Sequence, residues 1–385
     1  MNQERRVFMA HDAYYQIKRV SELYGLLQDD ISRNIFWARL KQDIAPSITG
    51  MIQLFGAMNE LSYEEFGQKF KWKEEFRRIL SEGKQIFLYG AGGVGETIAK
   101  GILADGYNFS GFIDRNYEAF MQEGLLGKPV YAQRYLSEHR DTSYICLAVL
   151  GKHADEVLEE LKKIDFPDDH ILQYFGGISL SSRVYFDFPA SEFFEYGTAF
   201  VDGGCFDGTD CMNFAKWCGG NYSKIFAIEP DPGNFKRCEE NLSRVKNVRL
   251  LEVALGKERS QMEFLARSGQ NSMFSHMQEF NAVMNHNPEQ ENMMMVEIAP
   301  LDEVVRETKV GYIKMDLEGC EWDALSGAKN TIVRDRPFLA ICVYHIPGDV
   351  LAILDYLHQL VPEYRFWLRH YTSASSETIL YASVK

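Results

Sequence analysis

Residues 200–210 read FVDGGCFDGTD and join a short apolar run to a segment with apolar residues at helical spacing. The apolar run ends at Val201, and the helical spacing is carried by the residues from Phe214 to Cys218. Three glycines stand between the two segments, where they remove side chains from a tight turn. The stretch predicts a β-strand, a turn and the start of an α-helix, with room for a small molecule against the turn.

The next predicted strand, residues 225–228, runs directly into Glu229. In an open α/β sheet, ligands bind at the carboxyl ends of the strands, where an acidic side chain can accept both hydroxyl protons of a ribose. No Lys-Ser or Lys-Thr pair follows the glycines, so the turn is not a P-loop. The region also carries Asp202, Asp207 and Asp210, which together with Glu229 would repel a pyrophosphate. These features favour a cationic ligand with a ribose, and S-adenosylmethionine has that chemistry.

From about Phe200 to its C-terminus, the chain resembles the FkbM family of S-adenosylmethionine-dependent methyltransferases. Five segments carry the resemblance in order: FVDGGCFDGTD, IFAIEPDPGNFKRCEENL, EVALG, VGYIKMDLEGCEWDALSGA and RPFLAICVYH. Five ordered blocks are more specific than one glycine motif. The resemblance implies a class I methyltransferase fold and transfer of a methyl group to an oxygen of a sugar or related polyhydroxylated metabolite. The chain departs from the family pattern at Cys205 and Phe206, and again at residues 342–344.

The expected cofactor site combines the glycine turn with the residues that follow the second and third strands. Asp231 and Pro232 are expected to cap and begin a helix, and residues 254–256 follow the third strand, where an adenine would rest. The full predicted set is Asp202, Gly203, Gly204, Phe206, Asp207, Gly208, Glu229, Pro230, Asp231 and Ala254.

Three further residues are expected at the same edge of the sheet and are candidates for the chemistry. Asp316 ends a predicted central strand, Glu318 follows it, and His345 follows the predicted strand 338–343. A hydroxyl acceptor needs a base within hydrogen-bond reach, and a carboxylate or an imidazole can serve. Asp316 is the first candidate and Glu318 the second, while His345 is either a base or a structural residue. The three side chains could also hold a divalent cation, but nothing in their spacing requires one and we expect metal-free chemistry.

A second nucleotide-binding pattern lies earlier in the chain. The predicted strand 86–89 runs into GAGGVG, from Gly90 to Gly95, a G-x-G-x-x-G turn that opens a helix. Asp114 ends the next strand, at the position of a ribose-binding acid. The unit resembles the small Rossmann-like domains found ahead of sugar-modifying enzymes, which implies that Gly90, Gly92, Gly95 and Asp114 contact a nucleotide or nucleotide-sugar. Glycines at such a turn also serve helix packing alone, and both alternatives stay open.

The expected fold is α/β, with two Rossmann-like doubly wound domains preceded by a helical N-terminal region. Residues 1–84 are the helical region, 85–180 the first Rossmann-like domain and 181–385 the methyltransferase domain. Aromatic residues at helical spacing in the first region indicate packing on the next domain or on a second copy of the chain, and an acceptor-binding surface is the alternative. The polar, methionine-rich stretch 266–295 is either a lid over the acceptor or a surface insertion.

The composition narrows the class of protein. The 385 residues are 46% hydrophobic and 25% charged, as in globular proteins, and a formal net charge of -14 argues against nucleic-acid binding. We find no signal-peptide pattern and no apolar run of membrane-helix length, so we expect a cytoplasmic protein without a membrane partner. Seven cysteines without a C-x-x-C pair indicate reduced thiols. The expected partner is a small-molecule or glycan acceptor.

Two other classes of function stay open. A nucleotide-sugar oxidoreductase would use the turn from Gly90 to Gly95 with a dinucleotide, but no hydride-transfer constellation accompanies that turn. A non-catalytic nucleotide-binding protein would have a degenerate site, whereas Asp202, Glu229 and Asp316 are all present.

Overall fold

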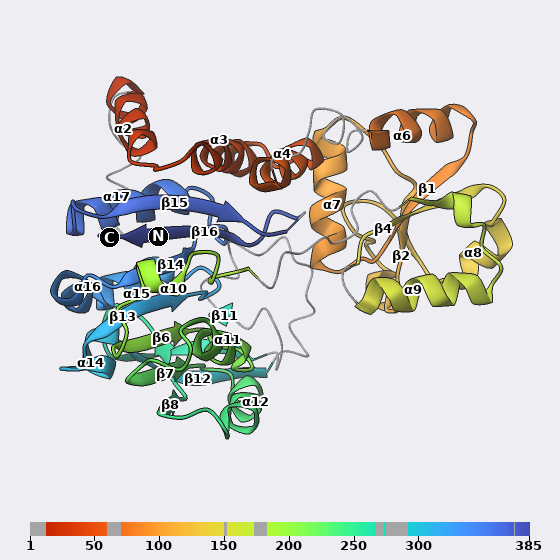
Figure 1. Cartoon of the computed structure of the whole chain (residues 1–385). Helices are drawn as coiled ribbons and strands as arrows, with labels where there is room; N and C mark the ends of the chain where they lie inside the picture. The colour runs from red at the N-terminus through yellow and green to blue at the C-terminus, as the bar shows by residue number, and fades with distance from the viewer. Residues whose placement is uncertain are drawn as a thin grey trace.

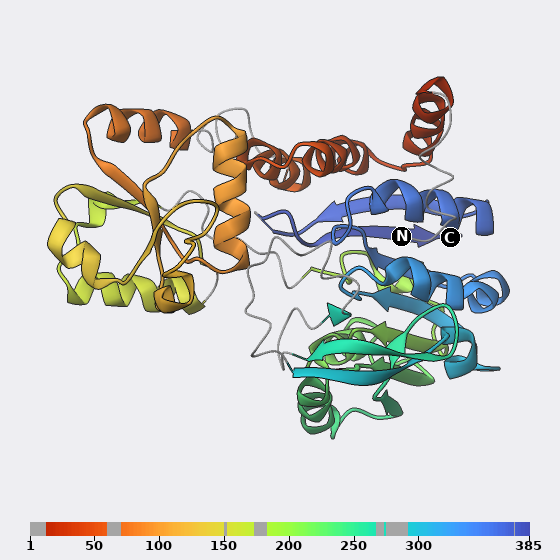
Figure 2. The ribbon, with the colours of Figure 1, turned by 180° about the vertical axis from the view of Figure 1, so that it is seen from behind.

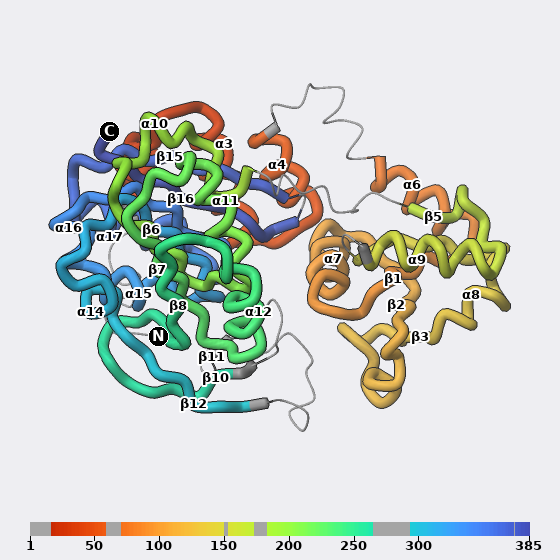
Figure 3. The backbone as a smooth tube through the Cα atoms, turned by 60° about the horizontal axis from the view of Figure 1, so that its bottom comes forward, coloured from red at the N-terminus to blue at the C-terminus, as the bar shows by residue number. Residues whose placement is uncertain are grey.

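The computed structural model describes residues 13–59, 71–149, 152–172, 183–266, 273–274, 292–372 and 374–385. Two α/β lobes lie next to each other, and N-terminal helices run along one side of the larger lobe toward the smaller one (Figure 1). Figure 3 shows the same two lobes from another direction, with α7 (Gly93–Ala104) on the side of the smaller lobe that faces the larger. Within the described ranges, every helix is too short or too polar to cross a membrane.

The larger lobe is built on a seven-stranded sheet with the order β15-β16-β14-β13-β6-β7-β8. The strands from β14 to β8 in this order are parallel, and β16 pairs antiparallel with both β14 and β15. Central strands are apolar and buried because helices cover both faces. The bounds are β6 (Ala199–Gly203), β7 (Lys224–Ile228), β8 (Val248–Leu251), β13 (Val310–Met315), β14 (Phe338–Cys342), β15 (Arg365–His370) and β16 (Thr378–Ser383).

The order of the strands reverses next to β6. β7 and β8 lie on one side of β6, whereas β13 and β14 lie on the other. Such a switch point opens a crevice at the carboxyl ends of the strands, which is where ligands of open α/β sheets bind. This arrangement is that of a class I methyltransferase, so the predicted fold of the C-terminal region is confirmed.

Short helices connect the strands of the larger lobe. They are α10 (Ala190–Phe193), α11 (Thr209–Trp217), α12 (Pro232–Leu242), α14 (Leu301–Val305), α15 (Glu321–Gly327), α16 (Lys329–Asp335) and α17 (Asp349–Leu360). A second sheet has the strand order β11-β10-β12-β9. In Figure 2, which views the molecule from behind, it lies nearer the viewer than the main sheet. Its strands are β9 (Ala254–Leu255), β10 (Ser260–Ala266), β11 (Met273–Phe274) and β12 (Asn292–Ala299).

The second sheet corrects one expectation about the stretch 266–295. Met293, Met294 and Met295 lie in β12 and pair with β10, so they belong to a strand and not to an irregular loop. Met293 and Met295 are exposed while Met294 is half-buried, which is the alternation of a strand with one covered face. The remaining polar residues of the expected lid, Gln270, Asn271, His276, Asn285, His286 and Asn287, lie outside the described residues.

The smaller lobe contains a parallel five-stranded sheet with the order β3-β2-β1-β4-β5, which confirms the first Rossmann-like unit. Its strands are β1 (Gln85–Tyr89), β2 (Gly111–Ile113), β3 (Val130–Tyr131), β4 (Ser143–Leu147) and β5 (Ile171–Leu172). Its helices are α7, α8 (Arg134–His139), α9 (Lys152–Lys163) and the 3-10 turns η1 (Tyr117–Phe120) and η2 (Asp168–His170). The expected boundary between residues 180 and 181 lies outside the described residues.

The N-terminal helices pack on both lobes. They are α2 (Ala13–Gly25), α3 (Asp30–Ile44), α4 (Ile48–Asn59) and α6 (Lys71–Ser81). α3 covers the edge strand β15, where the Leu368 N–H donates to Ser32 Oγ at 2.9 Å and Arg369 pairs with Asp29 at 2.7 Å. α4 continues to α7, where Thr49 Oγ1 donates to Asp105 at 2.8 Å. The N-terminal helices therefore pack both on the edge of the larger lobe and on the smaller lobe.

Candidate active site

The glycine turn follows β6 at the switch point, and its shape depends on neighbouring parts of the protein. Gly204 and Gly208 have φ values of +71° and +81°, which disfavour other residues. A Cβ on Gly204 would lie 2.0 Å from the Asp316 carbonyl oxygen, and one on Gly208 would lie 2.8 Å from Leu242 Cγ. Protein atoms therefore fill the Cβ direction of these two glycines, which serve packing of the turn, and their contact with a ligand stays a prediction.

Glu229 follows β7 and ties the glycine turn to the next helix. Its Oε2 accepts from the Phe206 N–H at 2.9 Å, and its Oε1 accepts from the Asp231 N–H at 3.0 Å and from Asn234 Nδ2 at 3.3 Å. The carboxylate is buried, and burial raises its pKa to about 7. The structure therefore puts this acid where the sequence predicts a ribose-binding residue, at the carboxyl edge of the sheet.

Several other residues of the predicted cofactor set have local structural roles. Asp231 caps α12 by accepting from the Gly233 and Asn234 N–H groups at 2.8 and 3.0 Å, as the sequence predicts. Asp207 accepts from the Thr209 N–H at 3.0 Å at the start of α11. Of the other members of the set, Gly203 ends β6, Pro230 is half-buried between Glu229 and α12, and Ala254 is buried in β9 of the second sheet.

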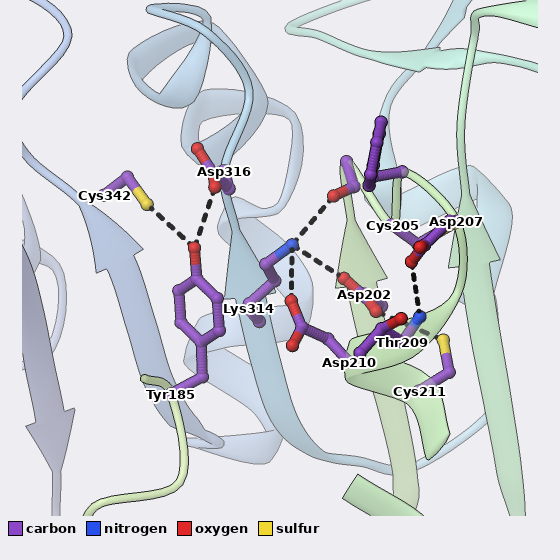
Figure 4. A network of polar contacts seen from close by, with 12 residues as sticks. Tyr185, Asp202, Cys205, Asp207, Thr209, Asp210, Cys211, Lys314, Asp316 and Cys342 are labelled. Carbon is purple, nitrogen blue, oxygen red and sulfur yellow. Dashed lines mark hydrogen bonds and ion pairs between the residues drawn. The ribbon is translucent and has the colours of Figure 1, made fainter. Parts of the chain in front are cut away.

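Lys314, which is not among the predicted site residues, is a buried cation under the turn (Figure 4). Its Nζ lies 3.0 Å from Asp202 Oδ1 and 3.6 Å from Asp210 Oδ2, and donates to the Gly204 carbonyl at 2.8 Å. Asp202 is fully buried and also accepts from Cys211 Sγ at 3.1 Å. Asp202 is therefore an internal counter-ion that orders the turn, and Lys314 offsets part of the negative charge that we expected to attract a cationic ligand. The available signal was a lysine within an otherwise apolar strand.

Asp210 is the partly exposed member of this ion-pair network. Burial raises its pKa to about 6, and the charge of Lys314 acts in the opposite direction. Its side chain keeps 27% of its surface exposed, whereas that of Asp202 has none. Asp210 is therefore the acid of the network that faces the solvent side of the crevice.

The three predicted catalytic residues come together beside the turn. His345 Nε2 lies 3.4 Å from Asp316 Oδ1 and 3.7 Å from Glu318 Oε2. Glu321, which is not among the predicted site residues, is a buried acid at the start of α15, and its Oε1 lies 2.9 Å from His345 Nδ1. Burial alone would lower the pKa of His345, but Glu321, Asp316 and Glu318 outweigh it and raise that pKa to about 10. These three acids therefore favour the protonated imidazole, and the role of His345 as a base or a structural residue stays a prediction.

Asp316 is held by tyrosines from two other segments. Tyr185 OH donates to Asp316 Oδ2 at 2.8 Å and Tyr344 OH donates to Oδ1 at 3.4 Å (Figure 4 shows the Tyr185 contact). Burial alone would raise the pKa of Asp316, but His345, Lys314 and Tyr185 bring it below its ordinary value. Asp316 is thus an oriented carboxylate whose side chain remains 24% exposed at the crevice.

The hairpin between β15 and β16 brings another acid to this edge. Burial and the charge of Asp316 together raise the pKa of Glu377 to about 7. Neither Glu377 nor Tyr185 stands in a recognisable motif, since each reaches the site from a segment distant in sequence from Asp316. The sequence alone therefore offered no signal for Glu377.

In the glycine turn of the smaller lobe, Gly90 and Gly95 are closely packed, whereas Gly92 borders open space. Gly90 has a φ of +116°, and a Cβ on Gly95 would lie 1.9 Å from the Gly90 carbonyl oxygen. A Cβ on Gly92 would meet nothing within 4 Å. Asp114 accepts from the Ala91 N–H at 2.6 Å and from the Asn116 N–H at 2.7 Å, so its carboxylate braces the turn.

We expect Gly95→Ala to lower the free energy of unfolding of the smaller lobe by about 2 kcal/mol, because the new methyl group collides with backbone. Gly92→Ala is the matched control and should change this quantity by less than about 0.5 kcal/mol. Scanning calorimetry of the full chain compares the two variants. Equal destabilisation by both substitutions would contradict the assignment of Gly92 to open space.

A cavity of 530 Å³ lies elsewhere in the smaller lobe, between η1, β3 and α8. Its lining includes the aromatic side chains of Tyr117, Phe120, Tyr131 and Tyr135. None of the predicted site residues lines it, so it is separate from both glycine turns.

The fold and the site define a class I methyltransferase architecture with acids gathered at the carboxyl edge of the sheet. Residues 202–368 match the model of the methyltransferase FkbM domain, and residues 85–165 match that of the PglD N-terminal domain. The larger lobe therefore contains an FkbM methyltransferase domain, as the resemblance in sequence implied. The matched region includes Glu229, Lys314, Asp316, Glu321 and His345.

The chain is also similar to individual proteins. It is 28% identical over 151 residues to the 2-O-methyltransferase NoeI of Sinorhizobium fredii (strain NBRC 101917 / NGR234). That similarity covers 35% of this chain and 59% of NoeI, so the chain spans about three fifths of the length of this curated relative.

Two solved structures are similar at low identity. The methyltransferase FkbM of Methylobacillus flagellatus KT is 16% identical with a TM-score of 0.46, over 80% of this chain and 92% of that one. A SAM-dependent O-methyltransferase of Thermotoga maritima is 13% identical with a TM-score of 0.31, over 51% of this chain and 63% of that one.

Proposed function

We propose that this protein transfers a methyl group from S-adenosylmethionine to a hydroxyl oxygen of a sugar or related polyhydroxylated metabolite. The observation that carries the proposal is the FkbM domain with Glu229 and Asp316 at one carboxyl edge, on either side of the switch point. The printed activity of NoeI, 2-O-methyl transfer, supports oxygen as the acceptor atom. The acceptor is a small molecule or a glycan.

The chemistry of the donor and acceptor groups fits S-adenosylmethionine. Glu229 receives hydrogen bonds from Phe206, Asp231 and Asn234, yet burial still raises its pKa, so the carboxylate gains from further donors. Ribose hydroxyls are such donors. Asp210 and Asp316 keep part of their surface exposed in the crevice, where negative charge favours a cationic ligand.

S-adenosylmethionine supplies an electrophilic methyl group whose carbon–sulfur bond breaks as the new carbon–oxygen bond forms. The main demand on the protein is alignment of the reacting groups in a site that excludes water. Glu229 would hold the ribose, and the braced turn would fix its position. Asp316, oriented by Tyr185 and Tyr344, would accept a hydrogen bond from the acceptor hydroxyl and take its proton. Glu318 would line the acceptor side next to it.

A direct experiment tests the proposal. The full chain is incubated with S-adenosylmethionine labelled on the methyl group and with a panel of sugars, nucleotide-sugars and catechol-type diols. Label is expected to enter a polyhydroxylated acceptor in an alkali-stable ether linkage, and Asp316→Asn should slow its transfer by about 100-fold. Transfer only to a nitrogen acceptor, or equal rates in wild type and Asp316→Asn, would reject the proposed reaction.

We expect binding of S-adenosylmethionine to tighten about tenfold between pH 6 and pH 8. Burial raises the pKa of the unliganded Glu229 to about 7, although the hydrogen bonds that it accepts act in the opposite direction. The ribose hydroxyls bind the ionised form, so affinity rises as the carboxylate loses its proton. Calorimetric titration across this range measures the effect, and Glu229→Gln should be flat by comparison. A pH dependence that persists in Glu229→Gln would assign the effect to another group.

For the smaller lobe, we propose a nucleotide or nucleotide-sugar as ligand. The G-x-G-x-x-G turn at the start of α7 and the open space at Gly92 support this. Saturable binding of a nucleotide-sugar that becomes weaker in the Gly92→Ala variant would support the assignment. Unchanged binding in Gly92→Ala would oppose it.

A further inference from the structure

We propose that Asp316, Glu321 and His345 form a binding site for a divalent cation. Each residue offers one ligand atom, and these three atoms all lie within 4.8 Å of one another. Ligand atoms around a bound cation are typically about 3 to 4 Å apart when each lies a little over 2 Å from the ion. Small side-chain movements therefore bring the group to coordinating distance.

An unpartnered oxygen in the cluster is the second observation. The Glu321 side chain has none of its surface exposed. Its Oε1 accepts from the Leu317 N–H at 2.7 Å and lies 2.9 Å from His345 Nδ1, but its Oε2 has no hydrogen-bond partner among the residues that the structure describes. A buried carboxylate oxygen without a partner is costly, and a cation would satisfy it.

The backbone holds the three ligands on ordered elements. Asp316 directly follows β13, His345 follows the adjacent parallel strand β14, and Glu321 is the first residue of α15. Sites on strand ends and helices are more rigid than sites on loops. Tyr185 also fixes the Asp316 carboxylate through a 2.8 Å hydrogen bond. The backbone positions of the three ligands are thus fixed, and only small side-chain movements are needed for coordination.

The cluster is closed on one side and open on the other. Glu321 is fully buried and the His345 side chain is 9% exposed, whereas Asp316 is 24% exposed. Glu318, whose Oε2 lies 3.7 Å from His345 Nε2, is at the open side. Three protein ligands with an open side leave coordination positions for water or for oxygen atoms of a substrate, as in catalytic metal sites.

The ligand types select the class of cation. Two carboxylates suit hard cations such as Mg²⁺ and Mn²⁺, and an imidazole suits borderline transition metals. Mn²⁺ accepts both kinds of ligand, so we assign the site to Mn²⁺ or a cation of similar preference. The imidazole must give up its proton when it binds the ion.

This inference rests on the proposed function where it concerns the acceptor. A cation at this position would face the crevice that Asp316 shares with the acceptor, and it would bind two neighbouring hydroxyl oxygens of a sugar. Coordination makes a hydroxyl more acidic, which helps its oxygen to act as a nucleophile. The site thus favours acceptors with vicinal hydroxyl groups over those with an isolated one.

The test is a titration of the chelator-treated full chain with Mn²⁺, followed by electron paramagnetic resonance of the free ion and by calorimetry. One Mn²⁺ is expected to bind per chain. His345→Gln and Glu321→Gln should each weaken binding at least tenfold. Asp210→Asn is the matched control, since it removes a carboxylate of the same edge that lies outside the cluster, and should leave binding within twofold. Thermal unfolding shows whether each variant is folded.

Two outcomes would overturn the proposal: no Mn²⁺ binding to the wild-type chain, or equal binding in wild type and a folded His345→Gln variant. Binding of S-adenosylmethionine to the same preparation separates this inference from the proposed function. If the adenosyl ligand binds and Mn²⁺ does not, only the cation site is rejected. If Mn²⁺ binds and the adenosyl ligand does not, the proposed methyl donor is rejected and the cation site stands.

Discussion

Replacement of Glu229 by glutamine should weaken binding of S-adenosylmethionine about 100-fold. The substitution keeps the shape of the side chain and removes its charge. Hydrogen bonds from ribose hydroxyls to a carboxylate are worth about 1.5–3 kcal/mol each, and a loss near 2.7 kcal/mol corresponds to a hundredfold change in the dissociation constant. Glutamine can still accept from the Phe206 N–H through its amide oxygen, so the turn is expected to stay folded.

Calorimetric titration of wild type and variant at pH 8 measures this effect. Glu252→Gln is the control, because Glu252 is an exposed acid that follows β8 at the same edge of the sheet. We expect its dissociation constant to stay within twofold of wild type. Equal affinities in wild type and Glu229→Gln would remove Glu229 from the cofactor site.

The second large effect is expected from Lys314→Met. Lys314 is fully buried between Asp202 and Asp210, and the substitution leaves Asp202 as a buried charge without its cation. Breaking a buried pair by removing one partner typically costs about 3–5 kcal/mol of unfolding free energy. We expect a loss of this size at pH 7, together with loss of order in the turn whose Gly204 carbonyl accepts from Lys314.

Urea unfolding followed by tryptophan fluorescence measures this loss, because Trp217, Trp322 and Trp367 all lie in the larger lobe. The double variant Lys314→Met, Asp202→Asn removes both charges and should recover at least half of the lost stability. A single variant within about 1 kcal/mol of wild type would show that the pair does not stabilise the lobe.

Much of the fold could be predicted because its signals are local. The runs that become β6, β7 and β13 are largely apolar and end at a glycine or directly before an acid, which is the pattern of parallel strands with ligands at their carboxyl ends. The stretch around Met293–Met295 was harder, since three successive methionines show no alternation of polar and apolar residues. Only pairing with β10 identifies it as a strand.

In the candidate site, too, the residues marked by a local sequence pattern could be predicted, whereas partners from distant segments could not. Glu229, Asp316 and His345 follow strands, so their place at one edge could be predicted from the sequence. The neighbouring residues that determine the charge of these three side chains could not be predicted from the sequence. Glu377 reaches the cluster through the hairpin between β15 and β16, and Lys314 could be identified as a counter-ion only once Asp202 was seen to point inward.

The pKa of His345 shows why residue identity alone gave an ambiguous role. A histidine after a strand can be a base, a structural residue or a metal ligand, and the choice depends on its neighbours. Glu321, Asp316 and Glu318 surround its two nitrogens and raise its pKa to about 10. Glu321 belongs to the helix after β13, and its inward orientation is a property of the packed structure.

The central claim is that the crevice beside Glu229 binds S-adenosylmethionine. Calorimetric titration of the purified full chain with S-adenosylmethionine, S-adenosylhomocysteine and NAD tests it most directly. We predict saturable binding of both adenosyl ligands at one site per chain, without competition from NAD. Saturable binding of NAD with no binding of either adenosyl ligand would contradict the claim and move the chemistry to the turn between Gly90 and Gly95.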